Sequence, residues 1–219
     1  MNNDIEKISV LNTDEIGEAI AQHINTAISN GKKVLWLISG GSSIPVAVAA
    51  AKALGSVDQD LLRIGLVDEK FTAEENLSNG AQLTEAGFTI DFSPIILPNV
   101  DLDKCGSEYE TYIKDSLGWA DMSIGQFGIG NGYHTGGIVA GSPAITDEAY
   151  VTDYSMNDER HITLTTRVIE ELDIAIINST GEAKRSLVAH FIESDVPIEK
   201  EPTQALKRAR RTILYSDVL

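Results

Sequence analysis

Two glycine-rich stretches and the polar residues around them carry the chemistry that this sequence can do. The first, residues 39–43 (SGGSS), directly follows the apolar run 34–38 and precedes the helix-forming segment 45–54. Glycines let the backbone turn sharply and bring several N–H groups to one anion, while the following helix adds its positive end. The stretch predicts a phosphate-binding loop; a strand-to-helix turn without ligand is the competing interpretation. Its spacing fits neither the Walker pattern nor GxGxxG, which disfavours ATP and dinucleotides.

The second stretch, residues 130–137 (GNGYHTGG), contains a histidine after another apolar run, residues 123–130. A histidine in a glycine-rich loop has little to contribute to core packing, and its imidazole titrates near neutral pH. His134 is therefore a candidate general base, and a chance loop histidine is the alternative.

Charged residues at three further places complete the candidate set. Residues 68–70 (DEK) end the apolar run 61–67 and can supply a proton acceptor plus a cation, or form a solvated loop. Arg160 and Lys184 precede or follow predicted strands, and each has an alternative as a plain surface charge. No HxH, CxxC or clustered carboxylate and histidine spacing indicates a metal site.

These residues need a scaffold of strands whose ends meet, and the hydrophobic pattern predicts one. Apolar runs typical of buried strands alternate with helical segments along the whole chain, which predicts one α/β domain over residues 1–219. We expect a mainly parallel sheet with helices on both faces and the ligand site at the carboxyl ends of its strands. The predicted strands are residues 34–38, 61–67, 123–130, 161–165, 174–178 and 211–216, with residues 94–98 as another strand or an extended segment. The predicted helices are residues 14–30, 45–54, 81–86, 106–117 and 166–172, and a further helix starts after Lys184.

The composition narrows the partners and the compartment. A net charge of −16 repels nucleic acid and anionic membrane surfaces, so neither is expected as a partner. Cys105 is the one cysteine, the first thirty residues do not have the pattern of a secretion signal, and the apolar runs are shorter than a membrane span. These features predict a cytoplasmic protein, and they leave open whether it is a monomer or a homodimer.

Six segments, taken in order, resemble the 6-phosphogluconolactonase family, which belongs to a larger group with the glucosamine-6-phosphate deaminases. They are ISGGSSIP, VDEKF, LSNG, FGIGNGYHTGGIVAGSP, RHITLT and STGEAK, and they extend over residues 38–184. The resemblance implies the Rossmann-like sugar-phosphate isomerase/lactonase fold, with neither metal nor cofactor. It implies hydrolysis of 6-phospho-D-glucono-1,5-lactone to 6-phosphogluconate, a step of the pentose phosphate pathway.

The resemblance also implies a role for each matching residue. His134 would activate the attacking water, and Asp68 and Asn79 would orient the sugar ring. Lys70 stands where lactonases usually have arginine, which keeps the charge without the planar bidentate fork. The phosphate would be held by Gly40, Gly41, Ser42, Arg160 and Lys184.

The sequence departs from the family pattern beside the histidine and leaves two other functions open. The family usually reads Asp-Gly-His, whereas this chain reads Gly132-Tyr133-His134, so a carboxylate that would orient the imidazole is missing. We expect Tyr133 to narrow the site or to forbid a positive φ. One alternative is therefore a weak or inactive sugar-phosphate-binding protein. The other is a phosphosugar isomerase or deaminase with Asp68 as proton carrier, although residues 138–141 lack the glutamate that deaminases carry.

Overall fold

A computed structural model describes residues 4–71, 78–97, 100–156 and 159–219 of the chain. Within these ranges the largest element is a six-stranded sheet in which every neighbouring pair of strands is parallel. The strand order across it is β1-β9-β8-β5-β2-β3. Its strands are β1 (Ile5–Ser9), β2 (Val34–Ile38), β3 (Leu62–Leu66), β5 (Met122–Gly128), β8 (Ile174–Asn178) and β9 (Arg211–Ser216). The predicted α/β architecture is confirmed.

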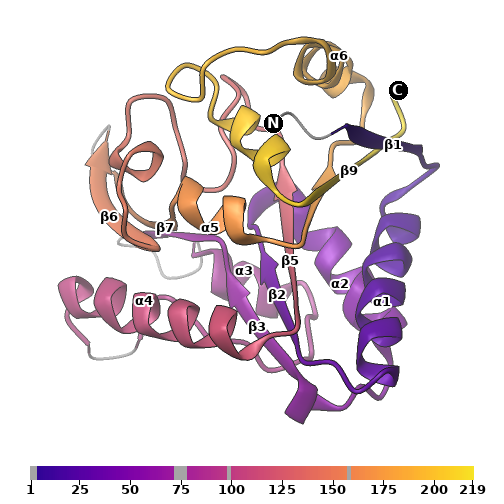
Figure 1. The fold of residues 1–219 in the computed structure, drawn as a ribbon, viewed down its shortest axis with the longest axis vertical. Helices are drawn as coiled ribbons and strands as arrows, with labels where there is room; N and C mark the ends of the chain where they lie inside the picture. The colour runs from indigo at the N-terminus through magenta and orange to yellow at the C-terminus, as the bar shows by residue number, and fades with distance from the viewer. Residues whose placement is uncertain (1–3, 72–77, 98–99, 157–158) are drawn as a thin grey trace.

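Helices cover both faces of this sheet, as predicted (Figure 1). Helices α1 and α2 lie together on one face, and α4, α5 and α6 lie on the other, as expected for right-handed crossovers between parallel strands in this order. The helices are α1 (Thr13–Ser29), α2 (Ile44–Leu54), α3 (Asn79–Glu85), α4 (Leu102–Trp119), α5 (Thr166–Glu171) and α6 (Arg185–Glu193). Short 3-10 turns are η1 (Gly41–Ser43), η2 (Gln59–Leu61), η4 (Pro143–Ile145), η5 (Glu182–Lys184) and η6 (Pro202–Arg208).

Helix α1 shows how the sequence fixes these elements. The Oδ1 of Asn12 accepts hydrogen bonds from the backbone N–H groups of Asp14 (3.0 Å) and Glu15 (3.1 Å), which caps the helix. Isoleucines spaced four apart then line its inner face, and Ile16 and Ile20 are fully buried. The cap and the apolar face together set the start and the orientation of the helix.

The strands at the centre of the sheet are mostly apolar because both of their faces are covered. All five residues of β2 and of β8 are buried, and Trp36 is the largest of the fully buried side chains. In β5 the buried residues run from Ser123 to Phe127, and in β8 burial extends to its last residue, Asn178. The loops at the carboxyl ends therefore begin from rigid positions.

A second, three-stranded antiparallel sheet departs from the sequence prediction. It consists of β4 (Asp68–Phe71), β7 (Glu159–Leu164) and β6 (Val151–Met156), in the order β4-β7-β6. The prediction placed residues 68–70 at the carboxyl end of the strand 61–67, as a proton acceptor with a cation or as a solvated loop, and residues 161–165 in a strand of a mainly parallel sheet. Both segments pair with each other instead, because Val67 turns the chain out of β3 and directly into β4. The segment 94–98 forms no strand over its described residues 94–97, and residue 98 lies outside the described residues. The neighbouring Ser93 makes an isolated bridge to Gly65.

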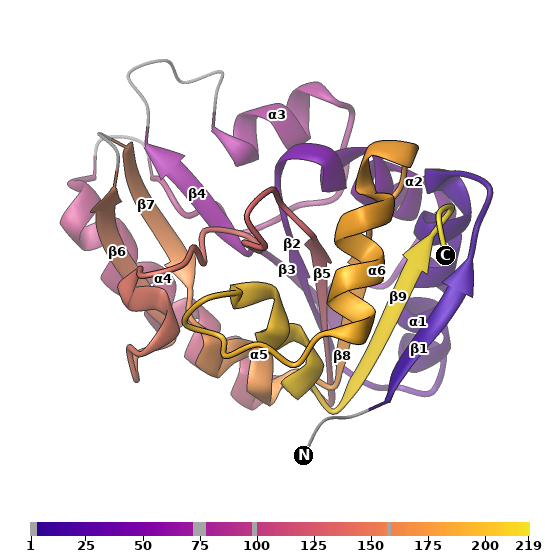
Figure 2. The ribbon, with the colours of Figure 1, turned by 90° about the horizontal axis from the view of Figure 1, so that it is seen from above.

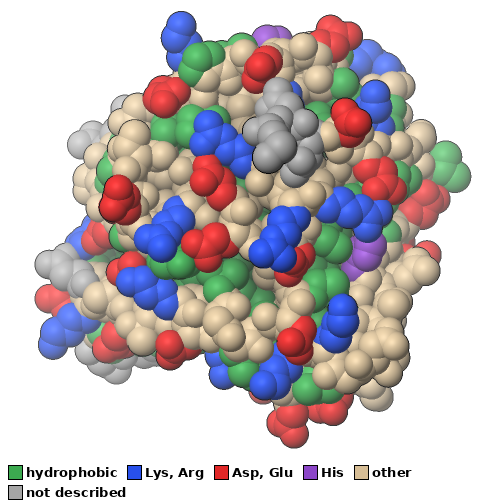
Figure 3. Space-filling model, viewed as in Figure 1, with side chains coloured by type: hydrophobic (Ala, Val, Ile, Leu, Met, Phe, Trp, Pro, Cys, Tyr) green, Lys and Arg blue, Asp and Glu red, His purple; other side chains and the backbone are tan. Residues whose placement is uncertain are grey.

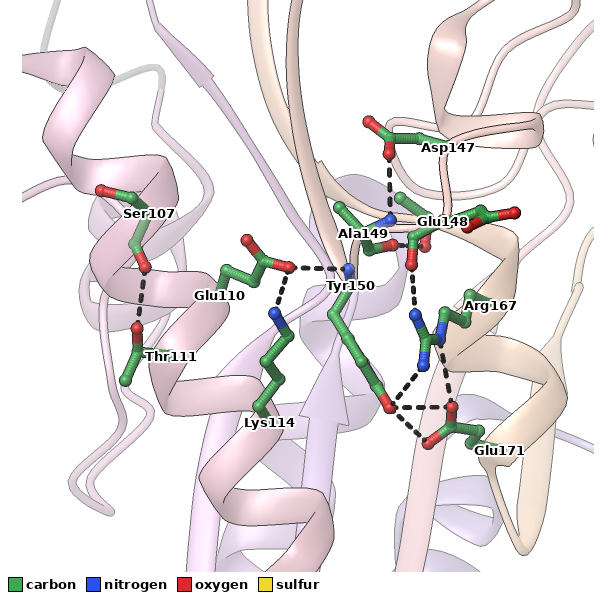
Figure 4. Close-up of polar contacts among 11 residues, drawn as sticks. Ser107, Glu110, Thr111, Lys114, Asp147, Glu148, Ala149, Tyr150, Arg167 and Glu171 are labelled. Carbon is green, nitrogen blue, oxygen red and sulfur yellow. Dashed lines mark hydrogen bonds and ion pairs between the residues drawn. The ribbon is translucent and has the colours of Figure 1, made fainter.

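A polar cluster around Tyr150 joins α4 to α5 (Figure 4). The Arg167 guanidinium lies 4.3 Å from the centre of the Tyr150 ring, and the Lys114 ammonium lies 5.6 Å from it. The Tyr150 hydroxyl donates to Glu171 (2.9 Å), and its backbone N–H donates to Glu110 (3.2 Å) on α4. The aromatic ring is thus placed between two cations and two carboxylates.

We expect Tyr150→Ala to lower the free energy of unfolding by about 1–2 kcal/mol, because it removes the cation–π contacts and the packing of the ring together. Tyr150→Phe keeps the ring and should lose less than half of that. Urea denaturation of the three proteins measures this difference. Equal losses for the two variants would assign the stabilisation to the hydroxyl rather than to the ring.

The surface carries mixed charge in spite of the net acidity of the chain. On the face drawn in Figure 3, lysine and arginine side chains alternate with aspartate and glutamate rather than gathering in one patch. Of the helices in the described ranges, none combines the length and the apolar character that a bilayer crossing requires.

Candidate functional site

A cleft of about 430 Å³ opens at the carboxyl ends of β2 and β5, beside β4. Open α/β sheets bind ligands at this edge, and the volume is within the range of small-molecule sites. Figure 2 shows the loops after β2 and β5 meeting there, close to α3 and β4. The lining residues are Ser39, Gly40, Gly41, Ser42, Ser43, Asp68, Lys70, Asn79, Gln82, Gly128, Ile129, Gly130, His134, Gly136, Glu159 and Lys184.

The first glycine-rich stretch forms one wall of the cleft. Gly41 has a φ of +58°, a left-handed conformation that glycine adopts without strain. Gly40 leaves room for the Asn79 side chain, which a Cβ at this position would overlap. The Gln126 amide supports the loop from below by donating to the Ser43 carbonyl (2.8 Å), and α2 starts immediately afterwards. The structure thus builds the predicted turn with its backbone at the cleft surface.

Asn79 and Asp68 form the floor beside this loop. The Asn79 amide donates to the Asp68 backbone carbonyl (2.9 Å) and to its carboxylate (3.3 Å). Glu69, whose separate role the sequence did not reveal, points the other way and accepts backbone hydrogen bonds from Lys70, Asn79 and Gly80. Glu69 is therefore a buried cap for α3, and it holds Asn79 in place at the cleft.

Burial raises the pKa of Asp68 to about 7, and the negative charge of Glu69 adds to the increase. The Lys70 charge and the Asn79 hydrogen bond oppose it. The carboxyl group is 6% exposed and lines the cleft, so it can exchange a proton with a bound ligand near neutral pH.

This pKa has a consequence for stability that Asp68→Asn tests. The folded protein binds the Asp68 proton more tightly than the unfolded chain, whose aspartate has the ordinary value of 3.8. The stabilisation of the folded state by this proton is fully present below about pH 4 and is lost as the pH rises through 7. We therefore expect the Tm of Asp68→Asn, minus that of the wild type, to increase between pH 4 and pH 8. A constant difference across calorimetric scans in this range would contradict the raised pKa.

The second glycine-rich stretch presents His134 from a tight turn. Gly132 and Tyr133 have φ values of +74° and +58°, so the expectation that tyrosine would forbid a positive φ is wrong. The turn is closed by hydrogen bonds from the Tyr133 N–H to the Gly130 carbonyl (3.1 Å) and from the Gly130 N–H to the His134 carbonyl (2.9 Å). The imidazole packs flat on Gly130, where a Cβ would collide with it.

A backbone carbonyl orients the His134 imidazole in this chain. The His134 Nδ1 lies 2.7 Å from the Asn131 oxygen. Because a carbonyl can only accept, Nδ1 carries the proton in this contact, and Nε2 is left as the basic nitrogen. The missing carboxylate was expected to leave the ring poorly oriented, and the Asn131 carbonyl supplies that orientation instead.

Two of the three predicted cations lie at the cleft. Lys184 reaches across from η5 and donates to the Ile129 carbonyl (2.7 Å), and Lys70 makes an ion pair with Glu159 (3.2 Å). The sequence analysis did not identify Glu159 as a cleft residue. The alternation of side chains along the strand could have indicated it, because Glu159 lies two residues before His161 and therefore on the same face.

Arg160 departs from the expectation that it holds the phosphate. Its guanidinium makes an ion pair with Asp153 on β6, with the Nε 2.9 Å from one carboxylate oxygen, and it is not among the cleft-lining residues. The reason is the alternation of side chains along β7: His161 is opposite Lys70 on the cleft side of the strand, so Arg160 points to the other face. His161 is buried and stacks on Tyr154 with ring centres 5.0 Å apart.

Comparisons with known proteins identify the family and the fold of the chain. Residues 11–215 match a family model described as glucosamine-6-phosphate isomerases/6-phosphogluconolactonase. No curated protein sequence matches the chain.

Solved structures share the fold at low sequence identity. A 6-phosphogluconolactonase from Shewanella baltica superimposes with a TM-score of 0.79 at 20% identity, with 99% of each chain covered. One from Thermotoga maritima gives 0.75 at 18% identity, with 96% of this chain and 99% of that chain covered. A monomeric glucosamine-6-phosphate deaminase gives 0.76 at 18% identity, with 98% of each covered.

Proposed function

The chain belongs to the glucosamine-6-phosphate isomerase/6-phosphogluconolactonase family, and from this premise we propose that it hydrolyses 6-phospho-D-glucono-1,5-lactone to 6-phosphogluconate in the cytoplasm. The observation that carries the proposal is the His134 imidazole. Its Nδ1 is committed to the Asn131 carbonyl, and its ring lines the same cleft as the anion-binding loop 39–43. A base and a phosphate site thus share one small cavity, as a phosphorylated lactone requires.

The phosphate end of the substrate fits the wall built by the first loop. Backbone N–H groups at Gly40, Gly41 and Ser42 would surround the phosphate oxygens, with α2 behind them. Lys184 would supply a positive charge from the opposite side. Lys70 would contribute once the phosphate competes with Glu159 for its ammonium.

The reaction then needs a water at the lactone carbonyl. The His134 Nε2 would take a proton from this water as its oxygen bonds to the carbonyl carbon. The bond from that carbon to the ring oxygen breaks next, and the ring oxygen leaves as a hydroxyl after taking up a proton from the imidazolium. Asp68 and Asn79, held together at the floor, would orient the sugar hydroxyls during these steps.

A second candidate function rests on Asp68 rather than His134. A carboxyl group with a pKa of about 7 is suited to moving a proton between carbon atoms of a sugar phosphate. That chemistry corresponds to a phosphosugar isomerase or deaminase in the same cleft. A phosphosugar-binding protein without turnover is the third possibility, motivated by Gly132 and Tyr133.

A panel of substrates separates these functions. The purified protein is mixed with freshly generated lactone, with glucosamine 6-phosphate and with a hexose 6-phosphate, while acid release, ammonia release and aldose–ketose interconversion are followed. Our proposal expects acid release alone. Ammonia or a ketose product would replace it with the second candidate, and a Tm increase by 6-phosphogluconate with no turnover would replace it with the third.

A further inference from the structure

Tyr133, directly before His134, ties the loop of the proposed base to the C-terminal part of the chain. Its φ of +58° makes it the one non-glycine residue with positive φ among the described residues. A left-handed conformation costs a non-glycine residue roughly 1–2 kcal/mol, so its contacts must offset this strain. Two such contacts come from the segment that follows β8, drawn from orange to yellow in Figure 2.

The first contact is made by the aromatic ring. The Tyr133 ring packs on the imidazole of His190 on α6, with ring centres 4.6 Å apart and planes inclined at 42°. The second contact is made by the backbone, since the Thr203 N–H at η6 donates to the Tyr133 carbonyl (2.9 Å). Ring and carbonyl are thus held from two neighbouring elements. The backbone contact is available to any residue at position 133, whereas the contact with His190 needs an aromatic side chain there.

The His190 ring is itself fixed by a carboxylate. Its Nε2 lies 2.9 Å and 3.0 Å from the two carboxylate oxygens of Glu201, whose side chain is 14% exposed. Glu201 also accepts from the Gln204 amide (3.3 Å), and that amide donates to Ser194 as well (2.9 Å). The surface on which Tyr133 rests is therefore ordered before any ligand binds.

The hydrogen bonds that orient His134 lie within its own turn. Gly130 and Asn131 hold the His134 backbone and imidazole, and the Thr135 hydroxyl ties the following residue to the Gly128 carbonyl (3.0 Å). Tyr133 adds an outer support at the adjacent residue. We propose that Tyr133, His190 and Glu201 are positioning residues that hold the His134 imidazole toward the substrate, compensating for the absent carboxylate. The expected effect of these residues on the reaction rate rests on the proposed function, whereas their expected effect on the orientation of the His134 ring does not.

Paired variants test whether the Tyr133 ring, rather than its hydroxyl, supports the loop. Tyr133→Phe keeps the ring, whereas Tyr133→Gly removes the ring and relieves the left-handed φ. We expect Tyr133→Phe to match the wild type. Tyr133→Gly should lower kcat for the lactone roughly ten- to hundredfold, since small misplacements of a catalytic group have effects of this size, while KM changes less than twofold. A merely structural residue would not produce this split.

A double-mutant cycle and nuclear magnetic resonance complete the test. His190→Ala should lower kcat to a similar extent, and the double variant His190→Ala/Tyr133→Gly should lose little more, because both act through one contact. The ¹⁵N shifts of the His134 ring should report an Nδ1–H form in the wild type and Tyr133→Phe, and a mixture of tautomers in Tyr133→Gly. Wild-type kcat and an unchanged tautomer in Tyr133→Gly would overturn the inference. A wild type that fails to hydrolyse the lactone would refute the proposed function instead, and the tautomer measurement would still decide the positioning role.

Discussion

Replacing His134 with glutamine is expected to reduce the lactone hydrolysis rate by about 10²- to 10⁴-fold, the usual contribution of a positioned general base. Glutamine fills a similar volume and can keep a hydrogen bond to the Asn131 carbonyl, so the turn should stay closed. It cannot accept a proton from water. The loss should therefore appear in kcat, while the increase in Tm caused by 6-phosphogluconate persists.

A matched histidine outside the cleft provides the control. His23 lies on α1, is half-buried and is not among the cleft-lining residues. His23→Gln should retain the wild-type kcat. If His134→Gln also retains it, His134 is not the base, and the proton acceptor must be sought among the other cleft residues, with Asp68 first.

Lys184→Met is expected to raise the KM for the phosphorylated lactone about ten- to hundredfold, which corresponds to the loss of one charge-assisted hydrogen bond. The Lys184 ammonium is anchored on the Ile129 carbonyl and lines the same cleft as the first glycine-rich loop. Methionine keeps the length of the side chain and removes the charge. The kcat should change much less than KM, because the phosphate lies away from the reacting carbonyl.

Arg160→Met is the control for Lys184→Met. It also removes one positive charge, but from the face of β7 that turns away from the cleft. Its guanidinium pairs with Asp153 and does not line the cleft, so KM should stay within about twofold of the wild type. Steady-state kinetics on the two variants thus distinguish a local phosphate contact from a general effect of net charge. A comparable increase of KM in both variants would mean that the long-range field of the protein, rather than Lys184, attracts the substrate.

The parallel sheet could be predicted from the sequence because its signals are local. Buried strands such as 34–38 and 174–178 are short apolar runs, and α1 carries isoleucines at helical spacing behind an asparagine cap. The antiparallel sheet could not, since β4 follows β3 after a single residue and its partner β7 is about ninety positions further along the chain. Pairing at that distance leaves no local pattern.

The candidate site shows the same division. Glycine-rich loops and His134 are visible in the sequence because their residue types are unusual at those places. Arg160 does not line the cleft because its side chain is on the face of β7 that turns away from it. If β7 paired one residue out of register, Arg160 would take the place of His161 on the cleft side, and the sequence alone does not fix this register. The role of the Asn131 carbonyl could not be predicted either, because every residue has a carbonyl and only the turn geometry selects this one.

The most direct measurement of the central claim is the initial rate of acid release from fresh 6-phospho-D-glucono-1,5-lactone near pH 6.5, with unphosphorylated glucono-1,5-lactone as the matched substrate. Under the proposed function the cleft combines a base with a phosphate-binding loop, so we expect acceleration well above spontaneous hydrolysis for the phosphorylated lactone and little for the other. No acceleration of either would contradict lactone hydrolysis. Equal acceleration of both would contradict the assignment of loop 39–43 and Lys184 to the phosphate.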